Sequence, residues 1–216
     1  MGLPLPDSFY RRPTEAVARD LLGCRLVRRL ADGTRLSLVL VETEAYLGVL
    51  DRAAHTWGGR KTPRVRPMWG PGGHAYVFRV YGIHDCMNVV TGEEGTPEAV
   101  LVRAGVPDAW WRGGDPGRQA LLAGSGPGNL CRALAITTAL SGAPLGGEEL
   151  TLERAEPRAF EVLAGPRVGV DYAGESAGWP LRFAVAGCPA VTRRAGLRPL
   201  ASAPRARPRR AGRRSP

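Results

Sequence analysis

The chain has 216 residues and a mass of 23.1 kDa, and its 30 basic and 20 acidic side chains give a formal charge of +10. This length fits one domain, or one domain with a tail. The hydrophobic content of 44% is ordinary for a globular chain, and no apolar run approaches the ~20 residues of a membrane-spanning helix. The first residues lack the basic and apolar regions of a secretory signal, so we expect a cytoplasmic protein, nucleoid-associated if its source is bacterial.

The positive charge is concentrated at the C-terminal end. Residues 193–216 contain nine arginines and no acid, whereas residues 1–192 contain 21 basic and 20 acidic side chains. The C-terminal stretch also lacks aromatic residues and hydrophobic periodicity, which is typical of disorder. We therefore expect a domain over residues 1–192 and a basic, disordered tail over 193–216.

The first half of the chain indicates a sheet. The segment 16–22 has helical spacing and stops at a glycine. A long segment rich in Gly, Pro and Arg, residues 48–74, separates the first strand from the next and predicts an irregular loop. Strands are expected, from apolar and β-branched runs, over 36–41, 75–81, 87–90 and 99–104.

The second half mixes helices and short strands. Helical spacing predicts a short helix over 119–123 and a longer one over 129–140. Closing strands are expected over 151–153, 167–170 and 181–185. The whole pattern predicts an α+β fold: a single domain with a mixed, mainly antiparallel sheet and flanking helices.

The sequence offers few candidate residues for a metal site or for a lysine nucleophile. The four cysteines lie more than 40 residues apart, and the three histidines form no metal-ligand spacing with them. We therefore expect reduced, buried thiols and no metal. Lys61 is the only lysine, so a Schiff-base mechanism has a single candidate nucleophile.

Two carboxylates end the first strand. Glu42, Glu44 and Tyr46 are two residues apart, so in an extended strand their side chains share one face. Burial there would raise a carboxyl pKa and a neighbouring arginine would lower it, which is how a general base is tuned. The alternative is an ordinary charge at a strand end.

A basic segment follows these carboxylates. Between Tyr46 and Met68 the charged residues are five cations and one acid, Asp51. Such cations contact phosphates, and aromatic rings nearby can stack on bases. An acid, a basic loop and several rings together favour an enzyme that acts on a base extracted from a duplex. The cations are Arg52, Arg60, Lys61, Arg64 and Arg66; the rings are Tyr46, His55, Trp57, Trp69, Tyr76, Phe78 and Tyr81.

An ordered series of short blocks resembles the alkyladenine (3-methyladenine) DNA glycosylase family. The blocks are Glu42-Thr43-Glu44-Ala45-Tyr46-Leu47-Gly48, Ala53-Ala54-His55, Gly59-Arg60-Lys61-Thr62-Pro63-Arg64, Tyr81-Gly82-Ile83, Cys86-Met87-Asn88, Leu101-Val102-Arg103-Ala104, Ser125-Gly126-Pro127-Gly128-Asn129-Leu130, Arg167-Val168-Gly169-Val170 and Pro180-Leu181-Arg182-Phe183. The resemblance covers about residues 8–190. It implies a cofactor-free, monomeric enzyme that starts base excision repair by removing damaged purines from double-stranded DNA.

The resemblance assigns the chemistry to two residues. Glu44 matches the general base, which activates a water for attack on the anomeric carbon of a flipped nucleotide, and Arg103 matches the arginine that helps to hold this carboxylate and the water. A monofunctional glycosylase of this kind releases an alkylated or deaminated purine and leaves an abasic site. The presence of one lysine, within the basic loop, agrees with the absence of lyase activity.

The remaining roles concern the base and the DNA. Tyr46 and His55 match one wall of the base pocket and Phe78 the other, while Asn88 matches the residue that excludes normal guanine. Tyr81 matches the residue that wedges into the minor groove. The candidates for backbone contacts are Arg60, Lys61, Arg64 and Arg66.

Some positions depart from the family pattern. Phe78 replaces a frequent tyrosine, which keeps the ring and loses a hydroxyl group. Arg79 and Asp85 replace apolar or aromatic residues and are expected to face solvent. Gly72, Gly73 and His74 are expected in a loop near the wedge, with His84 beside Tyr81.

Two other functions are consistent with parts of the pattern. One is a protein that recognises damaged or structured nucleic acid without chemistry. The other is a structural module in which Glu44 is only a strand-end charge; that module would have no pocket beside Glu44.

Overall fold

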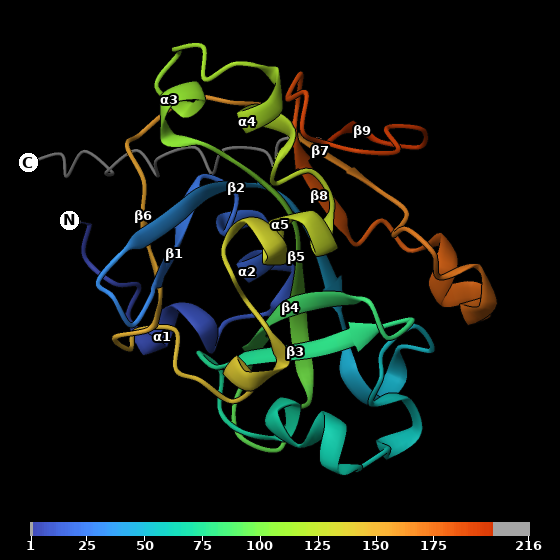
Figure 1. The fold of residues 1–216 in the computed structure, drawn as a ribbon. Coiled ribbons are helices and arrows are strands. Elements are labelled where there is room, and N and C mark those ends of the chain that lie inside the picture. Colours follow the sequence, from blue (N-terminus) through green and yellow to red (C-terminus); the bar gives the residue numbers. More distant parts are fainter. Residues whose placement is uncertain (1, 201–216) are drawn as a thin grey trace, which may run out of the picture.

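The computed structural model describes residues 2–200 of the chain (Figure 1). One antiparallel sheet organises them, in the order β3-β4-β5-β2-β8-β7-β9, and β1 pairs with both β2 and β6. The strands are β1 (Cys24–Arg29), β2 (Arg35–Tyr46), β3 (Ala75–Val80), β4 (His84–Thr91), β5 (Glu98–Val106), β6 (Leu150–Arg154), β7 (Val162–Gly165), β8 (Arg182–Val185) and β9 (Arg198–Pro199). This single-domain α+β architecture confirms the predicted fold class.

The helices are short. The α-helices are α1 (Asp7–Tyr10), α2 (Thr14–Asp20), α3 (Asp108–Trp111), α4 (Arg118–Leu122) and α5 (Pro127–Ala133). Short 3₁₀ helices lie in the loops: η1 (Gly48–Leu50), η2 (Trp57–Gly59), η3 (Pro63–Trp69), η4 (Thr138–Leu140) and η5 (Asp171–Gly178). No helix within residues 2–200 is long and apolar enough to cross a membrane.

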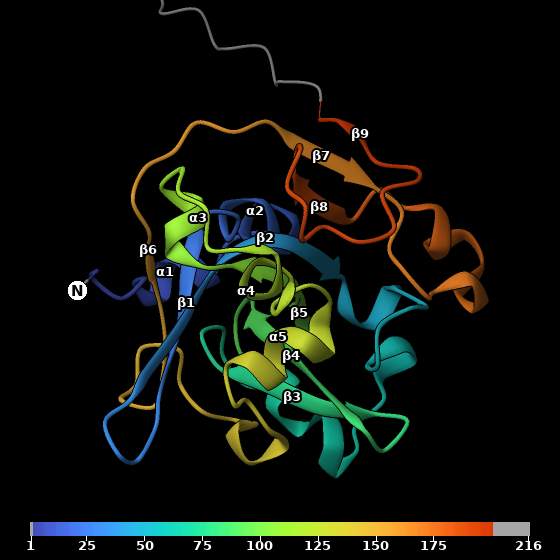
Figure 2. The same cartoon turned by 45° about the horizontal axis from the view of Figure 1, so that its top comes forward.

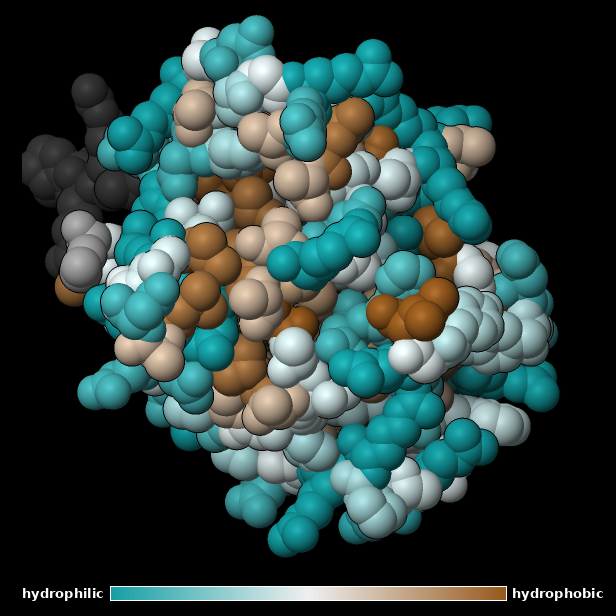
Figure 3. All heavy atoms as spheres, in the orientation of Figure 1, coloured by the Kyte–Doolittle hydropathy of each residue, from teal (hydrophilic) through white to brown (hydrophobic). Residues whose placement is uncertain are grey.

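Helices cover opposite faces of the sheet. Figures 1 and 2 show α5 on one face, over β4 and β5, and α2 on the other. Thr43 Oγ1 donates a 2.8 Å hydrogen bond to the Ala18 carbonyl of α2. Because side chains alternate along a strand, Glu42 and Glu44 therefore point away from α2, toward the side of α5. Figure 3 shows that hydrophobic side chains gather over and around α5 on that side, bordered by hydrophilic ones.

The two central strands carry an irregularity at the height of the carboxylates. In the pairing of β2 with β5, Glu42 is opposite Ala104 and Thr43 is opposite Val102. Arg103 therefore has no partner across the strands, as in a β-bulge. Bulges are common beside functional sites, where they redirect a side chain.

Most predicted elements are confirmed, and two are wrong. The helix predicted over 129–140 stops at Ala133, because Ala135 adopts a positive φ of 50° and the chain then turns into η4. The segment 167–170 is not a strand. The strand paired with β8 is instead β7, which lies just before it.

The ordered domain extends past the expected boundary at residue 192. Arg198 and Pro199 form β9 on β7, and the Arg193 carbonyl accepts a 2.9 Å hydrogen bond from Arg182. Residues 193–200 thus belong with the domain rather than with the tail. The rest of the predicted tail, residues 201–216, lies outside the described residues.

Candidate active site

A cavity of about 510 Å³ opens on the α5 side of the sheet. Its walls come from the β3–β4 hairpin, the turn that begins α5, and the segment 168–172. A concave site of this size with a few polar groups is typical of a small-molecule or base pocket. Six of the residues predicted from the sequence line it: Tyr46, His55, Phe78, Tyr81, Asn88 and Arg103.

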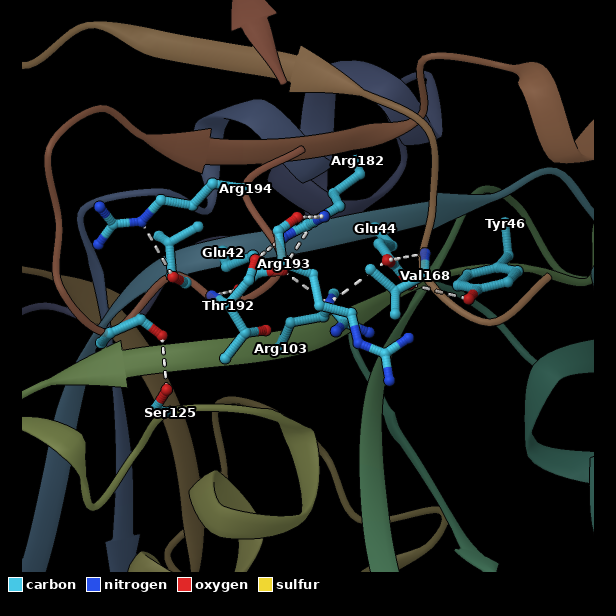
Figure 4. Close-up of polar contacts among 12 residues, drawn as sticks. Glu42, Glu44, Tyr46, Arg103, Ser125, Val168, Arg182, Thr192, Arg193 and Arg194 are labelled. Carbon is cyan, nitrogen blue, oxygen red and sulfur yellow. Dashed lines mark hydrogen bonds and ion pairs between the residues drawn. The ribbon is translucent and has the colours of Figure 1, made fainter. Parts of the chain in front are cut away.

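Glu44 lies directly behind this cavity and is completely buried. Its carboxylate accepts hydrogen bonds from the Tyr46 hydroxyl at 2.9 Å and the Val168 backbone N–H at 2.8 Å. Arg103 Nε lies 3.3 Å from Glu44 Oε1 (Figure 4). All three partners line the cavity, so only these residues separate the Glu44 carboxylate from the cavity wall.

The environment of Glu44 holds opposing electrostatic effects. Burial raises the pKa of the Glu44 carboxyl above its ordinary value, while Arg103, the Val168 N–H and the Tyr46 hydroxyl lower it. Donors directed at both oxygens stabilise the ionised form. A buried carboxylate that these donors stabilise in its ionised form can act as a proton acceptor.

Asp51 and Arg167 hold two loops together around this carboxylate. Both side chains are fully buried, and the guanidinium of Arg167 forms an ion pair with the Asp51 carboxylate. Arg167 also donates to the Ala45 carbonyl at 3.0 Å and lies 4.7 Å from the centre of the Tyr46 ring. This pair fixes Val168, whose N–H the sequence did not indicate as part of the site.

The aromatic wall differs in detail from the expectation. The rings of His55 and Phe78 touch edge to face, with centroids 4.5 Å apart, and Tyr76 stacks on Phe78 at 5.5 Å. A base between two stacked rings needs them about 7 Å apart, twice a carbon contact distance. His55 and Phe78, as they lie, are therefore one continuous wall, and the predicted sandwich stays a prediction for Tyr46 and Phe78.

His55 is held in a neutral form. Its Nδ1 lies 2.9 Å from the Tyr76 hydroxyl. Burial, with smaller contributions from Arg64 and Arg60, lowers the pKa of His55 to about 4. On the next strand, Asn88 is buried in the cavity wall, and its Nδ2 donates a 3.1 Å hydrogen bond to the Tyr76 carbonyl.

The β3–β4 hairpin presents Tyr81 at its tip. Tyr81 and Gly82 have φ values of 50° and 72°, and Ile83 N–H donates to the Val80 carbonyl, as in a type I′ turn. Tyr81 is 91% exposed at the rim of the cavity. An exposed ring on a tight turn has the geometry expected of a wedge.

Two expectations about neighbouring residues need correction. Arg79 and Asp85 do not simply face solvent: they form a two-pronged ion pair across the hairpin, at 2.8 and 3.0 Å. His74 immediately precedes the first residue of β3, whereas Tyr81 follows its last residue, so His74 lies at the other end of the strand from the wedge. His84, in contrast, lines the cavity beside Tyr81.

The predicted backbone contacts lie along η2 and η3. Arg60, Lys61, Arg64 and Arg66 are all exposed, and within the described part of the chain none has an acidic partner within 4 Å. Lys61 Nζ lies 4.2 Å from the Trp69 ring centre, and the Arg64 guanidinium 5.2 Å from that of Phe78. Contacts of these four cations with DNA phosphates stay a prediction.

The comparisons with known proteins decide the family. The model of the Methylpurine-DNA glycosylase family matches residues 8–189. The chain belongs to this family. The resemblance expected from the sequence is thereby confirmed, and with it the class of enzyme, a DNA glycosylase acting on methylated purines.

Individual relatives agree with the family match. A protein of Anaeromyxobacter dehalogenans strain 2CP-1, named "Putative 3-methyladenine DNA glycosylase", is 49% identical over 192 residues, which cover 88% of this chain and 86% of the relative. A protein of the same name from Methanocella arvoryzae is 47% identical, over 88% of this chain and 96% of its own length. One from Desulfitobacterium hafniense is 44% identical, over 83% and 93%.

Proposed function

We propose that this protein excises 3-methyladenine and other alkylated purines from double-stranded DNA, and that Glu44 activates the water that replaces the base. The observation that carries this proposal is the buried Glu44 carboxylate, held by three residues that themselves line a ring-walled cavity. If Glu44 were only an ordinary charge at a strand end, it would need none of these contacts. The cavity beside it also argues against a purely structural module.

The proposed reaction uses these residues as follows. A flipped nucleotide enters the cavity, and a water held near Glu44 and Arg103 attacks its anomeric carbon. The C–N glycosidic bond breaks, its electrons leave with the base, and Glu44 accepts the proton of the water. A purine alkylated on a ring nitrogen is cationic, so it leaves without being protonated and is attracted by the faces of aromatic rings.

Deaminated purines would need more help. Hypoxanthine is neutral, and its departure requires a proton. Among the described residues, no aspartate or glutamate lines the cavity, and His55 is neutral at physiological pH. We infer that alkylated bases are excised faster than hypoxanthine.

Water rather than an amine is the proposed nucleophile. Lys61 is exposed on the Trp69 ring and does not line the cavity. The enzyme would therefore be monofunctional and leave an intact abasic strand. We further propose that it acts as a monomer, with Tyr81 filling the gap left by the flipped base.

The test measures release of free 3-methyladenine from methylated duplex DNA, and cleavage of the product strand before and after alkali. The proposal predicts free base and a strand that breaks only after alkali. Binding of lesion DNA without base release would instead support a recognition protein without chemistry, while strand cleavage without alkali would contradict the monofunctional mechanism.

A further inference from the structure

Four charged side chains are buried together behind the cavity. Arg182, Glu42, Arg103 and Glu44 are exposed by only 1%, 0%, 6% and 0%. They come from β8, β2 and β5, which are adjacent in the sheet. Buried charges are tolerated only when they are paired, and this cluster alternates in sign and sums to zero.

Glu42 is the centre of the cluster (Figure 4). Its Oε1 accepts hydrogen bonds from Arg103 Nε and Arg182 Nε, both at 2.8 Å. The same Arg103 Nε lies 3.3 Å from Glu44 Oε1. Glu42 therefore holds in place the nitrogen of Arg103 that faces Glu44, the proposed general base.

Arg182 is anchored on its other side by the chain after β8. Its Nη1 donates to the Arg193 carbonyl at 2.9 Å, and its Nη2 donates to the Thr192 carbonyl. Thr192 N–H in turn lies 3.4 Å from Glu42 Oε2. Arg182 therefore joins Glu42 to a segment that has no contact of its own with the cavity.

We propose that Glu42 and Arg182 are positioning residues, which hold Arg103 beside Glu44 and keep the buried cluster electrically balanced. This inference rests on the proposed role of Glu44 as the base. Neither residue lines the cavity, so both act through Arg103 rather than on the substrate.

The balance has a sign that can be measured. Glu44 acts only when ionised, so the excision rate falls as the pH drops through the pKa of Glu44. We call this low-pH part of the profile of excision rate against pH the acid limb. Replacing Arg182 by a neutral residue leaves a cluster of charge −1, which disfavours a second carboxylate and moves this acid limb to higher pH. Replacing Glu42 leaves +1 and moves the limb to lower pH.

Other groups around Glu44 stay constant in these variants. On β2 this is the Tyr46 hydroxyl, on β5 Arg103, and after β7 the Val168 N–H. The Arg167 guanidinium lies beyond the Tyr46 ring and is neutralised by Asp51. Glu42 is itself among the groups that raise the pKa of Glu44, which agrees with the expected direction.

The experiment measures single-turnover excision of an alkylated purine against pH, for the wild type, Arg182→Gln, Glu42→Gln and the double variant. The acid limb should move up by about one pH unit in Arg182→Gln and down by about one in Glu42→Gln. The double variant restores a neutral pair, so its limb should return to the wild-type position. Glu42→Gln should also lower the plateau rate, because Arg103 loses a partner.

Two further variants separate charge from folding. Arg182→Lys keeps the charge and should keep the limb in place. Arg194→Gln is the matched control, since within residues 2–200 Arg194 donates only to the Cys188 and Val191 carbonyls on the same segment. If Arg182→Gln does not fold, Arg182→Lys and Glu42→Gln still carry the test.

The inference would be overturned if the acid limbs of Arg182→Gln and Glu42→Gln coincided with that of the wild type. It would also be overturned if both limbs moved in the same direction. Either result leaves the proposed function intact so long as Glu44→Gln is inactive. An active Glu44→Gln would overturn the proposed function instead.

Discussion

The Tyr46 hydroxyl donates a 2.9 Å hydrogen bond to Glu44 Oε2, two residues back on the same strand. The Tyr46 side chain thus presents its ring to the cavity and its hydroxyl to Glu44, the proposed general base. Recognition of the base and activation of water are joined in β2, because alternate residues of a strand point to one face.

Tyr46→Phe separates these two functions. The ring remains, while the loss of the hydrogen bond raises the pKa of Glu44, since this bond stabilises the ionised carboxylate. We expect the acid limb of excision to move up by about one pH unit, with lesion affinity unchanged. Single-turnover rates against pH and equilibrium binding measure both; an unmoved limb would show that the bond does not stabilise the carboxylate.

His55 makes folding sensitive to acid. The unfolded chain binds a proton at His55 below its ordinary pKa of 6.5, whereas the folded protein does not until about pH 4. Stability is therefore lost as the pH falls through this window, by about 2 kcal/mol between pH 7 and pH 5. Urea unfolding of the wild type and His55→Asn measures it. The variant should lose less stability than the wild type over this range; equal losses would contradict the account.

Tyr81→Ala should weaken base flipping and leave the water chemistry intact. Tyr81 is at the exposed tip of the hairpin, whereas Glu44 is completely buried. We expect a higher enzyme concentration for half-maximal single-turnover rate, with Tyr81→Phe as the control that keeps the ring. A variant that flips the base fully yet excises nothing would contradict this role.

The basic C-terminal residues should add salt-sensitive affinity for DNA. Because β9 pairs with β7 and belongs to the domain, a truncation that tests this should begin at residue 201 and not at residue 193, where the sequence predicted the tail to begin. Removing residues 201–216 takes away six arginines. We expect weaker binding at low salt, a smaller difference at high salt and a shallower salt dependence. Fluorescence anisotropy over a salt series measures this, and an unchanged slope would refute it.

Local patterns were sufficient for much of the sheet and for the aromatic rings at the cavity, whereas Asn88 and Arg103 were indicated only by the family resemblance. The alternation of Glu42, Glu44 and Tyr46 correctly predicted one shared face, since it depends only on strand geometry. The Gly-, Pro- and Arg-rich composition of residues 48–74 also predicted an irregular segment, in which the structure has only the short helices η1 to η3. The helix over 129–140 failed because helical spacing does not reveal the positive φ of 50° that Ala135 adopts.

The partners of the carboxylates could not be read from the sequence. Arg182 and Val168 reach Glu42 and Glu44 only through the pairing of β2 with β8 and the buried Asp51–Arg167 contact, which join residues more than a hundred positions apart. Both lay in recognised blocks, but nothing in their spacing assigned a partner. Long-range register is a property of the fold.

The central claim is that Glu44 activates the water. The most direct measurement is single-turnover release of 3-methyladenine from duplex DNA by the wild type and Glu44→Gln, with lesion binding measured in parallel. The amide keeps the size of the side chain and removes the base, so we expect binding to persist while excision falls by several orders of magnitude. Excision by Glu44→Gln at a rate near that of the wild type would contradict the mechanism.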